Sequence, residues 1–306
     1  HMIYGLSDGL KYKVIVTYSD LKAKEIYEEY RFYDRNVMLY PAKDLIFFQA
    51  DIHGNQLVQE RIKTLRRVVE GKPVTIVTTY AALMTPQVLW EEKDIIRTER
   101  GGSLDESRLA SRLVAMGYEK AYQVESPGQF SIRGGIVDIF DLTEENPYRI
   151  ELWGDEVDSI RSFDPESQRS IENLQEVYIY PACELVLTEE ERRSGVEKIK
   201  KEAKKVADKF RKEMKTEEAC RVQSMADQIA EETMEYGISA GLDAYLSYFC
   251  EERVSLLDYL KKEDSILFLD ETVRTVERGQ STETEFSESM KQRLEKGYIL
   301  PGQMRE

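Results

Sequence analysis

Two spacings of apolar residues alternate along the first ninety positions. Short apolar runs rich in β-branched residues predict three strands, at 13–18, 36–40 and 74–79. Apolar residues at helical spacing predict two helices between them, at 20–30 with Ser19 as N-cap and at 56–70. Short apolar strands that alternate with helices are typical of a parallel sheet covered by helices, so we predict an α/β domain over residues 1–90.

The pattern changes near residue 91. Ser103 and Glu106 have the spacing of a capping box, which predicts a helix that ends at Gly117. Beyond this helix only strand-like runs and turns follow, with expected strands at 129–132, 136–140, 148–153, 157–163 and 177–180. Glycine-containing turns at 134–135 and 154–155 favour hairpins. We therefore predict an inserted antiparallel α+β domain over residues 91–183.

The last part of the chain, 184–306, is mostly helical by the same criterion. A charged helix with a narrow apolar stripe is expected at 189–214, followed by helical segments at 225–234 and 245–260. One apolar strand interrupts them at 266–269. This part is predicted to pack on residues 1–90 as a second piece, which makes the fold class α/β and α+β multidomain.

The composition, 41% hydrophobic and 33% charged, is that of a globular protein. No apolar run of about 18 residues and no signal peptide is visible, so no membrane partner is expected. Cys183, Cys220 and Cys250 form no C-x-x-C pair, which predicts free buried thiols in a reducing, cytoplasmic location. His1-Met2 is typical of a cloning remnant, and we expect the natural chain to extend in both directions.

The formal net charge of −15 bears on the choice of partner. Proteins that grip DNA over many phosphates usually present a basic face. DNA is therefore an unfavourable main partner for this chain, although a local basic patch is compatible with the total. A protein partner of basic or mixed character fits better.

Nucleotide hydrolysis is the first chemistry to weigh. The strand at 266–269 ends in Asp270-Glu271, as does the metal-holding strand of a P-loop motor. Such a strand needs a phosphate cradle, and the nearest candidate, Gly5 to Lys11, has one residue too few between its glycines and no Ser or Thr after the lysine. The two acids are thus either a vestigial Walker-B-like pair or caps of the next helix, and no ATP hydrolysis by this chain is expected.

Other catalytic arrangements have weaker support. His53 lies in a polar stretch that predicts a surface turn. Acid pairs such as Glu91-Glu92 and Glu144-Glu145 are adjacent in sequence, which favours solvated carboxylates over an acid/base pair. Two histidines and three dispersed cysteines offer no metal set. We predict no catalytic residue, no metal and no cofactor.

A binding face is the second candidate. Several arginines fall in or beside the predicted strands of the middle domain: Arg133, Arg149, Arg161 and Arg169. Arg149 and Trp153 are four residues apart, so a regular strand projects both from one face. An exposed arginine beside an exposed aromatic ring is typical of protein interfaces. The alternative is that Trp153 belongs to the core and the arginines pair with local acids.

Two long motifs, Phe130-Ser-Ile-Arg-Gly-Gly-Ile-Val-Asp-Ile-Phe140 and Pro147-Tyr-Arg-Ile-Glu-Leu-Trp-Gly-Asp-Glu-Val-Asp-Ser-Ile-Arg-Ser-Phe-Asp164, carry a resemblance. They resemble a module shared by the bacterial excinuclease B subunit (UvrB) and the transcription-repair coupling factor (Mfd). The flanking segments 39–44 and 59–65 are closer to the N-terminal, UvrB-like region of the coupling factors. An excinuclease B subunit would carry an intact cradle and a tyrosine-rich hairpin, which this sequence does not show.

The resemblance implies a fold and a role. The fold would be a degenerate P-loop-like α/β domain in two pieces around an inserted domain that docks onto the excinuclease A subunit (UvrA). Its partner-binding positions fall on Arg133, Arg149 and Trp153, the last in place of the usual phenylalanine. The chain would be a non-catalytic recruitment module; the alternative is a fragment of an excinuclease-B-like ATPase whose phosphate loop is missing.

The resemblance also implies what lies outside this chain. Contacts with RNA polymerase and DNA, and ATP-dependent DNA translocation, would belong to other domains of the full protein. A C-terminal domain would mask the docking face in the resting state.

Overall fold

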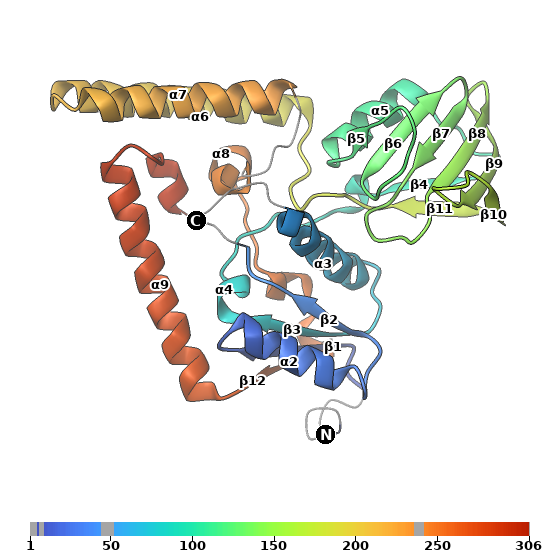
Figure 1. Cartoon of the computed structure of the whole chain (residues 1–306), viewed down its shortest axis with the longest axis horizontal. Coiled ribbons are helices and arrows are strands. Elements are labelled where there is room, and N and C mark those ends of the chain that lie inside the picture. Colours follow the sequence, from blue (N-terminus) through green and yellow to red (C-terminus); the bar gives the residue numbers. More distant parts are fainter. Residues whose placement is uncertain (1–4, 6–8, 44–51, 236–241, 306) are drawn as a thin grey trace. The chain divides into compact units, whose positions relative to one another are not determined.

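The computed structural model describes residues 5, 9–43, 52–235 and 242–305 (Figure 1). The chain forms two compact units. The first holds residues 1–89 and 191–306, and the second holds residues 90–190. The mixed α/β class, with one parallel sheet and mostly antiparallel pairing elsewhere, agrees with the prediction from the sequence.

The first unit is built on a parallel sheet of four strands in the order β12-β1-β3-β2. The strands are β1 (Tyr12–Thr17), β2 (Val37–Tyr40), β3 (Val74–Thr79) and β12 (Ser265–Leu269). The central strands β1 and β3 are buried almost without interruption, as strands covered on both faces are. The edge strand differs from the expected covered sheet, because Leu267 and Leu269 of β12 are exposed.

Two helices connect the first three strands, α2 (Asp20–Tyr30) and α3 (Ile52–Val69). Ser19 caps α2 as predicted, since its hydroxyl accepts a hydrogen bond from the amide of Lys22 at 3.2 Å. The turn expected around His53 is wrong, because α3 begins at Ile52. Weak helix formers are tolerated in a first turn, where the backbone amides have no partner within the helix.

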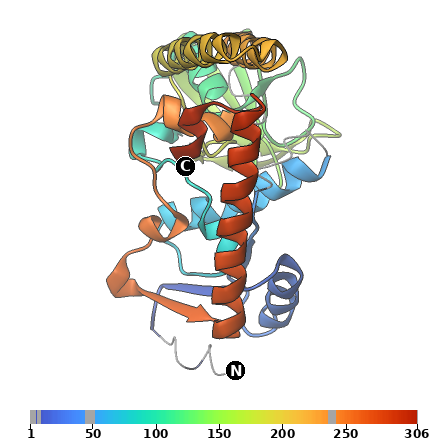
Figure 2. The same cartoon turned by 90° about the vertical axis from the view of Figure 1, so that its left-hand side faces the viewer.

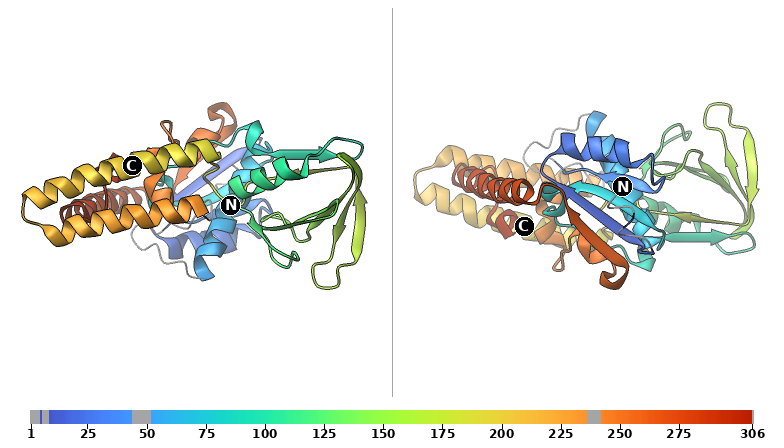
Figure 3. Two further views of the ribbon diagram at one scale, coloured as in Figure 1. Left: turned by 90° about the horizontal axis from the view of Figure 1, so that it is seen from above. Right: turned by 90° about the horizontal axis from the view of Figure 1, so that it is seen from below.

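Most of the remaining first unit is helical. Its regular elements are α4 (Tyr80–Leu83), α6 (Glu189–Lys212), α7 (Thr216–Glu235), η2 (Leu242–Tyr245), α8 (Leu246–Phe249), η3 (Leu256–Tyr259), η4 (Lys262–Asp264), α9 (Thr272–Glu295) and η5 (Pro301–Arg305). Helices α6 and α7 lie side by side as a hairpin (Figures 1 and 3). Figure 2 shows α9 as one unbroken helix that starts next to β12. Every helix in the described part of the chain is too short or too polar to cross a membrane.

The continuous helix expected at 245–260 is wrong. After α8 the backbone extends, and Val254 exchanges two backbone hydrogen bonds with Gln87, at 2.8 and 2.9 Å. This pairing, which joins residues far apart in the sequence, overrides the local helical preference of the segment. What remains between 246 and 260 is one turn of α-helix, α8, and one short 3-10 helix, η3.

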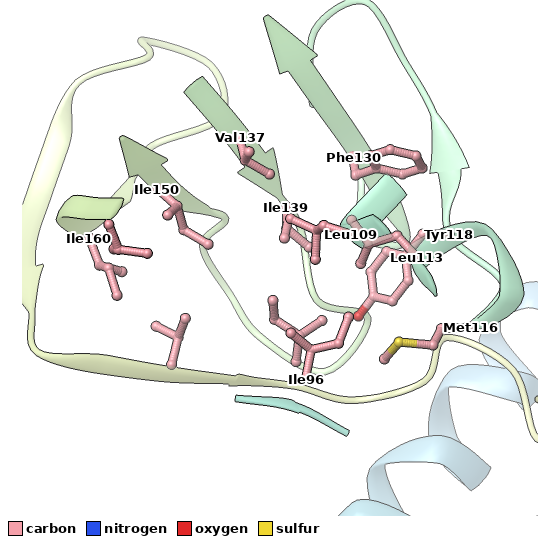
Figure 4. Packing of buried hydrophobic residues seen from close by; sticks show 13 residues of the cluster. Ile96, Leu109, Leu113, Met116, Tyr118, Phe130, Val137, Ile139, Ile150 and Ile160 are labelled. Atoms are coloured by element: carbon pink, nitrogen blue, oxygen red, sulfur yellow. The ribbon is translucent and has the colours of Figure 1, made fainter. Parts of the chain in front are cut away.

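The second unit contains a sheet of six strands in the order β10-β9-β8-β7-β6-β5 and a separate pair, β4 with β11. Its elements are η1 (Glu92–Asp94), β4 (Ile96–Glu99), α5 (Glu106–Ala115), β5 (Glu119–Lys120), β6 (Gln129–Arg133), β7 (Ile136–Ile139), β8 (Tyr148–Trp153), β9 (Glu156–Phe163), β10 (Ser170–Leu174) and β11 (Glu176–Ile179). All neighbouring strands of the large sheet are antiparallel except β5 and β6. One face of this sheet packs against α5, β4 and β11 through a cluster of buried apolar residues (Figure 4).

Local signals in the second unit are partly different from those expected. Asp105, not Ser103, caps α5: its carboxylate accepts from the amide of Arg108 at 2.9 Å, while Ser103 pairs with Glu156 as a β-bridge. The β6–β7 hairpin turns through Gly134 and Gly135, which have φ of 57° and 82° and so need glycine.

The three cysteines are free thiols, but they are not all buried. Cys220 is exposed on α7, and Cys250, after α8, is half-buried. Burial raises the pKa of Cys250 to about 11. Only the thiolate is nucleophilic, so at pH 8 Cys250 should hold far less reactive form than an ordinary thiol.

We expect iodoacetamide to alkylate Cys220 readily at pH 8 and Cys250 at least about 100-fold more slowly than a free thiol, because the thiolate population falls tenfold per pH unit below the pKa. The rate at Cys250 should rise as the pH approaches 11. Peptide mass spectrometry of timed samples measures both rates, and a Cys220→Ser variant is the control. Equal rates at the two thiols at pH 8 would contradict this prediction.

Candidate interaction face of the second unit

Strand alternation separates the six-stranded sheet into two faces. Residues such as Val137, Ile150 and Ile160 point to the buried core. The side chains between them form the opposite face, which we call the outer face; it carries Arg133, Asp138, Arg149, Glu151, Trp153 and Arg161. In the strand register Asp138 lies opposite Arg149, and Arg149 lies opposite Arg161.

Asp138 is the centre of this face. Its side chain is only 1% exposed. One carboxylate oxygen accepts from Nε of Arg149 at 2.7 Å, and the other accepts from Arg149 at 2.8 Å and from Arg133 at 3.0 Å. The Arg149 pair is bidentate, the strongest geometry for this interaction. A single buried carboxylate thus fixes two of the predicted binding arginines.

Arg149 is held on every side. Its guanidinium lies 4.2 Å from the centre of the Phe163 ring and donates to the Gln168 side chain at 2.9 Å. Gln168 takes a left-handed backbone conformation, with φ of 59°. The hydrogen bonds to Asp138 raise the pKa of Arg149 above its ordinary value. With its side chain 14% exposed, Arg149 is a rigid part of the face.

Arg133 and Trp153 are far more accessible. The Arg133 side chain is 40% exposed and lies 5.8 Å from the ring of Tyr122, itself an exposed residue. Trp153 is 84% exposed at the end of β8, so the part of the alternative that places it in the core is wrong. The part that pairs the arginines with local acids is confirmed for Arg133, Arg149 and Arg161. The β6–β7 and β8–β9 turns lie at the same end of the sheet, since Leu152 donates its amide to the Gly135 carbonyl at 2.7 Å.

Arg161 and Arg169, the other two arginines expected near this face, form no ion pair with Asp138. Arg161 forms an ion pair with Glu151, whose pKa is lowered by the hydroxyl of Ser159 and by Arg161. Arg169 is exposed in the loop that precedes β10. The sequence did not single out Asp138, Tyr122 or Gln168. The register of the predicted hairpins would have placed Asp138 opposite Arg149.

The vestigial Walker-B-like pair lies at the carboxyl end of β12. The Asp270 carboxylate accepts from the Thr17 hydroxyl at 3.0 Å, which ties β12 to β1. Glu271 occupies the N-cap position of α9 with φ of 44°, but its side chain makes no capping hydrogen bond and instead lies 3.4 Å from Arg274. The capping alternative for Glu271 is therefore wrong.

The candidate cradle, residues 5 to 11, lies partly outside the described residues. Its described end, Gly9 to Lys11, leads into the amino end of β1. In a P-loop the cradle follows the strand. At the carboxyl end of β1 only Tyr18 and Ser19 precede α2, beside a depression lined by Asp20, Thr79 and Arg278. The described residues hold no group of three His, Cys, Asp or Glu side chains suited to a metal ion.

Comparison with known proteins identifies the class of the second unit. Residues 96–185 match the protein family described as the UvrB interaction domain. This range includes β6 to β9 and the whole outer face. The middle of the chain is therefore similar to that family.

The chain as a whole is similar to transcription-repair-coupling factors. It is 38% identical over 270 residues to that of Bacillus subtilis (strain 168), which covers 87% of this chain and 22% of the relative. It is 32% identical over 267 residues to that of Staphylococcus aureus (strain Mu50 / ATCC 700699), which covers 86% and 22%. The predicted resemblance is confirmed and is consistent with the N-terminal region of these factors; the chain spans about a fifth of their length.

Proposed function

We propose that this chain is a non-catalytic recruitment module of a transcription-repair coupling factor. It would bind the excinuclease A subunit through the outer face of the second unit and so bring nucleotide excision repair to stalled RNA polymerase. The observation that carries the proposal is the exposure of Trp153 on the same outer face as Arg133, which is held on the buried Asp138. An accessible arginine and an exposed indole on one face are the residue types that anchor protein interfaces.

The geometry at the parallel sheet supports a non-catalytic role. A motor needs its Walker-B acid free for metal and its cradle at the end of the first strand. In this chain the Asp270 carboxylate accepts a hydrogen bond from Thr17. The connection from β1 to α2, where a cradle would lie, is only two residues long. We infer that Asp270 and Glu271 are vestiges of such a site and that the first unit is a degenerate P-loop-like domain.

The relatives extend the proposal beyond this chain. Since the chain spans about a fifth of their length, polymerase contacts and ATP-dependent DNA translocation would belong to domains outside it. Masking of the outer face by a C-terminal domain would be intramolecular in the full protein. The second candidate function is that of a fragment of an excinuclease-B-like ATPase. The strand that ends in Asp270-Glu271 is the feature that favours it.

Calorimetry with purified excinuclease A subunit tests the proposal. We expect the chain to bind it with a dissociation constant in the micromolar range or below, roughly −8 kcal/mol or better. The same preparation should release no phosphate from ATP. Absence of binding at concentrations of about 50 μM, well above such a constant, would overturn the recruitment function, and ATP turnover would favour the second candidate.

A further inference from the structure

A stripe of five lysines runs along α6. Its members, which we call the lysine stripe, are Lys198, Lys201, Lys205, Lys209 and Lys212. Their spacings of three and four residues place them on one side of the helix, over about 21 Å at 1.5 Å per residue. All five are exposed. The apolar side of α6, with Ile199, Ala203 and Phe210, is buried.

Within the described part of the chain, none of the five lysines has a carboxylate within ion-pair distance. Four acids lie next to the stripe along the helix; Glu197 is exposed and forms no ion pair with a stripe lysine, and the other three are engaged elsewhere. Glu202 accepts hydrogen bonds from Tyr248 and from the amide of Gly302. Asp208 pairs with Arg211, and Glu213 pairs with Lys215. Among the described residues, the five lysines of the stripe therefore carry their charge without an ion-paired acid, and Glu197 is the nearby acid left to offset it.

Some cations on or next to other helices of this chain have an acid partner. Lys22 pairs with Glu25, Arg31 with Glu28, and Arg274 with Glu271, each at the i,i+3 spacing. Like charges at such spacings destabilise a helix by about 0.2–0.5 kcal/mol per pair. The stripe contains four successive repulsive spacings, so it costs helix stability that alternation with acids would have avoided.

The local charge opposes that of the whole molecule. Between residues 198 and 212 the sequence has eight Lys or Arg and two Asp or Glu, a net of +6, against −15 for the chain. Such a concentration of one sign raises the local density of anions and is screened by salt.

We propose that the lysine stripe binds the phosphate backbone of duplex DNA without sequence preference. Lysines act as point charges on flexible stems, and a row of them can follow a row of phosphates. Within the span of the stripe Phe210 is buried and Arg211 pairs with Asp208, so neither is free to serve as an aromatic or arginine anchor of a protein interface. A membrane surface would need an adjacent exposed apolar face, and that of α6 is buried. This contact lies within the chain itself and is separate from the DNA contacts expected of other domains.

The test compares two variants with equal charge change. In the stripe variant, K198Q, K201Q, K205Q, K209Q and K212Q are combined. In the matched control, five exposed lysines elsewhere in the first unit are replaced: K24Q, K261Q, K262Q, K291Q and K296Q. Binding of the complete chain to a labelled 30-base-pair duplex is followed by fluorescence anisotropy at several salt concentrations. Circular dichroism establishes that all three proteins keep their helix content.

The wild-type chain should bind with a slope of log K against log salt of about −4, so that affinity falls on the order of 100-fold between roughly 50 and 200 mM salt. The control should keep this slope, and the stripe variant should lose most of it. No binding by the wild type at low salt, or equal loss in both variants, would overturn the proposal. Displacement of the duplex by a poly-glutamate peptide of equal charge at equal concentration would assign the stripe to an acidic protein segment instead.

Discussion

Replacement of Trp153 with alanine is expected to weaken binding of the excinuclease A subunit by about 2 kcal/mol, roughly 30-fold in the dissociation constant. The indole is 84% exposed, so its removal takes away contact area with the partner and almost none from the fold. Arg133→Ala should have an effect of similar size. Calorimetric titration measures both, and thermal unfolding should show midpoints close to that of the wild type.

Two substitutions serve as controls for this result. Trp153→Phe keeps an aromatic ring at the position and should bind within a few-fold of the wild type. Tyr178→Ala removes a partly exposed aromatic side chain from β11, in the other sheet of the same unit, and should leave binding unchanged. If Trp153→Ala binds as tightly as the wild type, the outer face is not the docking surface.

Replacement of Asp138 with alanine should have the largest effect on stability. Arg149, 14% exposed, would lose its bidentate partner and remain as an uncompensated cation between strands. Breaking one half of a buried ion pair costs about 3–5 kcal/mol. Chemical denaturation should therefore show a loss of about 3 kcal/mol in the free energy of unfolding of the second unit, and partner binding should fall because Arg133 is released.

The physical cause can be isolated by a double substitution. Removing both charges, in Asp138→Ala with Arg149→Met, should recover part of the lost stability, since no unpaired charge is then buried. Asp158→Asn, which changes an exposed acid on β9, should be neutral. Equal stability of Asp138→Ala and the wild type would show that the three hydrogen bonds to Asp138 contribute nothing to the fold.

The sequence predicted those elements whose signals are local and strong. Strand β3 has the expected bounds, because every residue in it is apolar or β-branched and buried. Strand β8 likewise follows from its alternation and its flanking glycine turn. By contrast β10 was missed: its residues are mostly exposed, and its position depends on pairing with β9 across a bulge.

The candidate site shows the same limit. Alternation placed Arg149 and Trp153 on one face, and that is where β8 holds them. Their difference in exposure could not be derived from spacing, because it depends on Asp138 from the next strand and on Gln168 from the loop before β10. Side chains brought together by strand register and loop conformation are the part of a site that one sequence does not reveal.

The position of β12 has a consequence for how the chain is made. This strand pairs with β1 although the bonded residues Thr17 and Asp270 are 253 positions apart. During synthesis, residues 90–190 leave the ribosome long before β12 does. They can therefore fold before the parallel sheet acquires its last strand. Because β12 joins at an edge, its late arrival displaces no strand already in place.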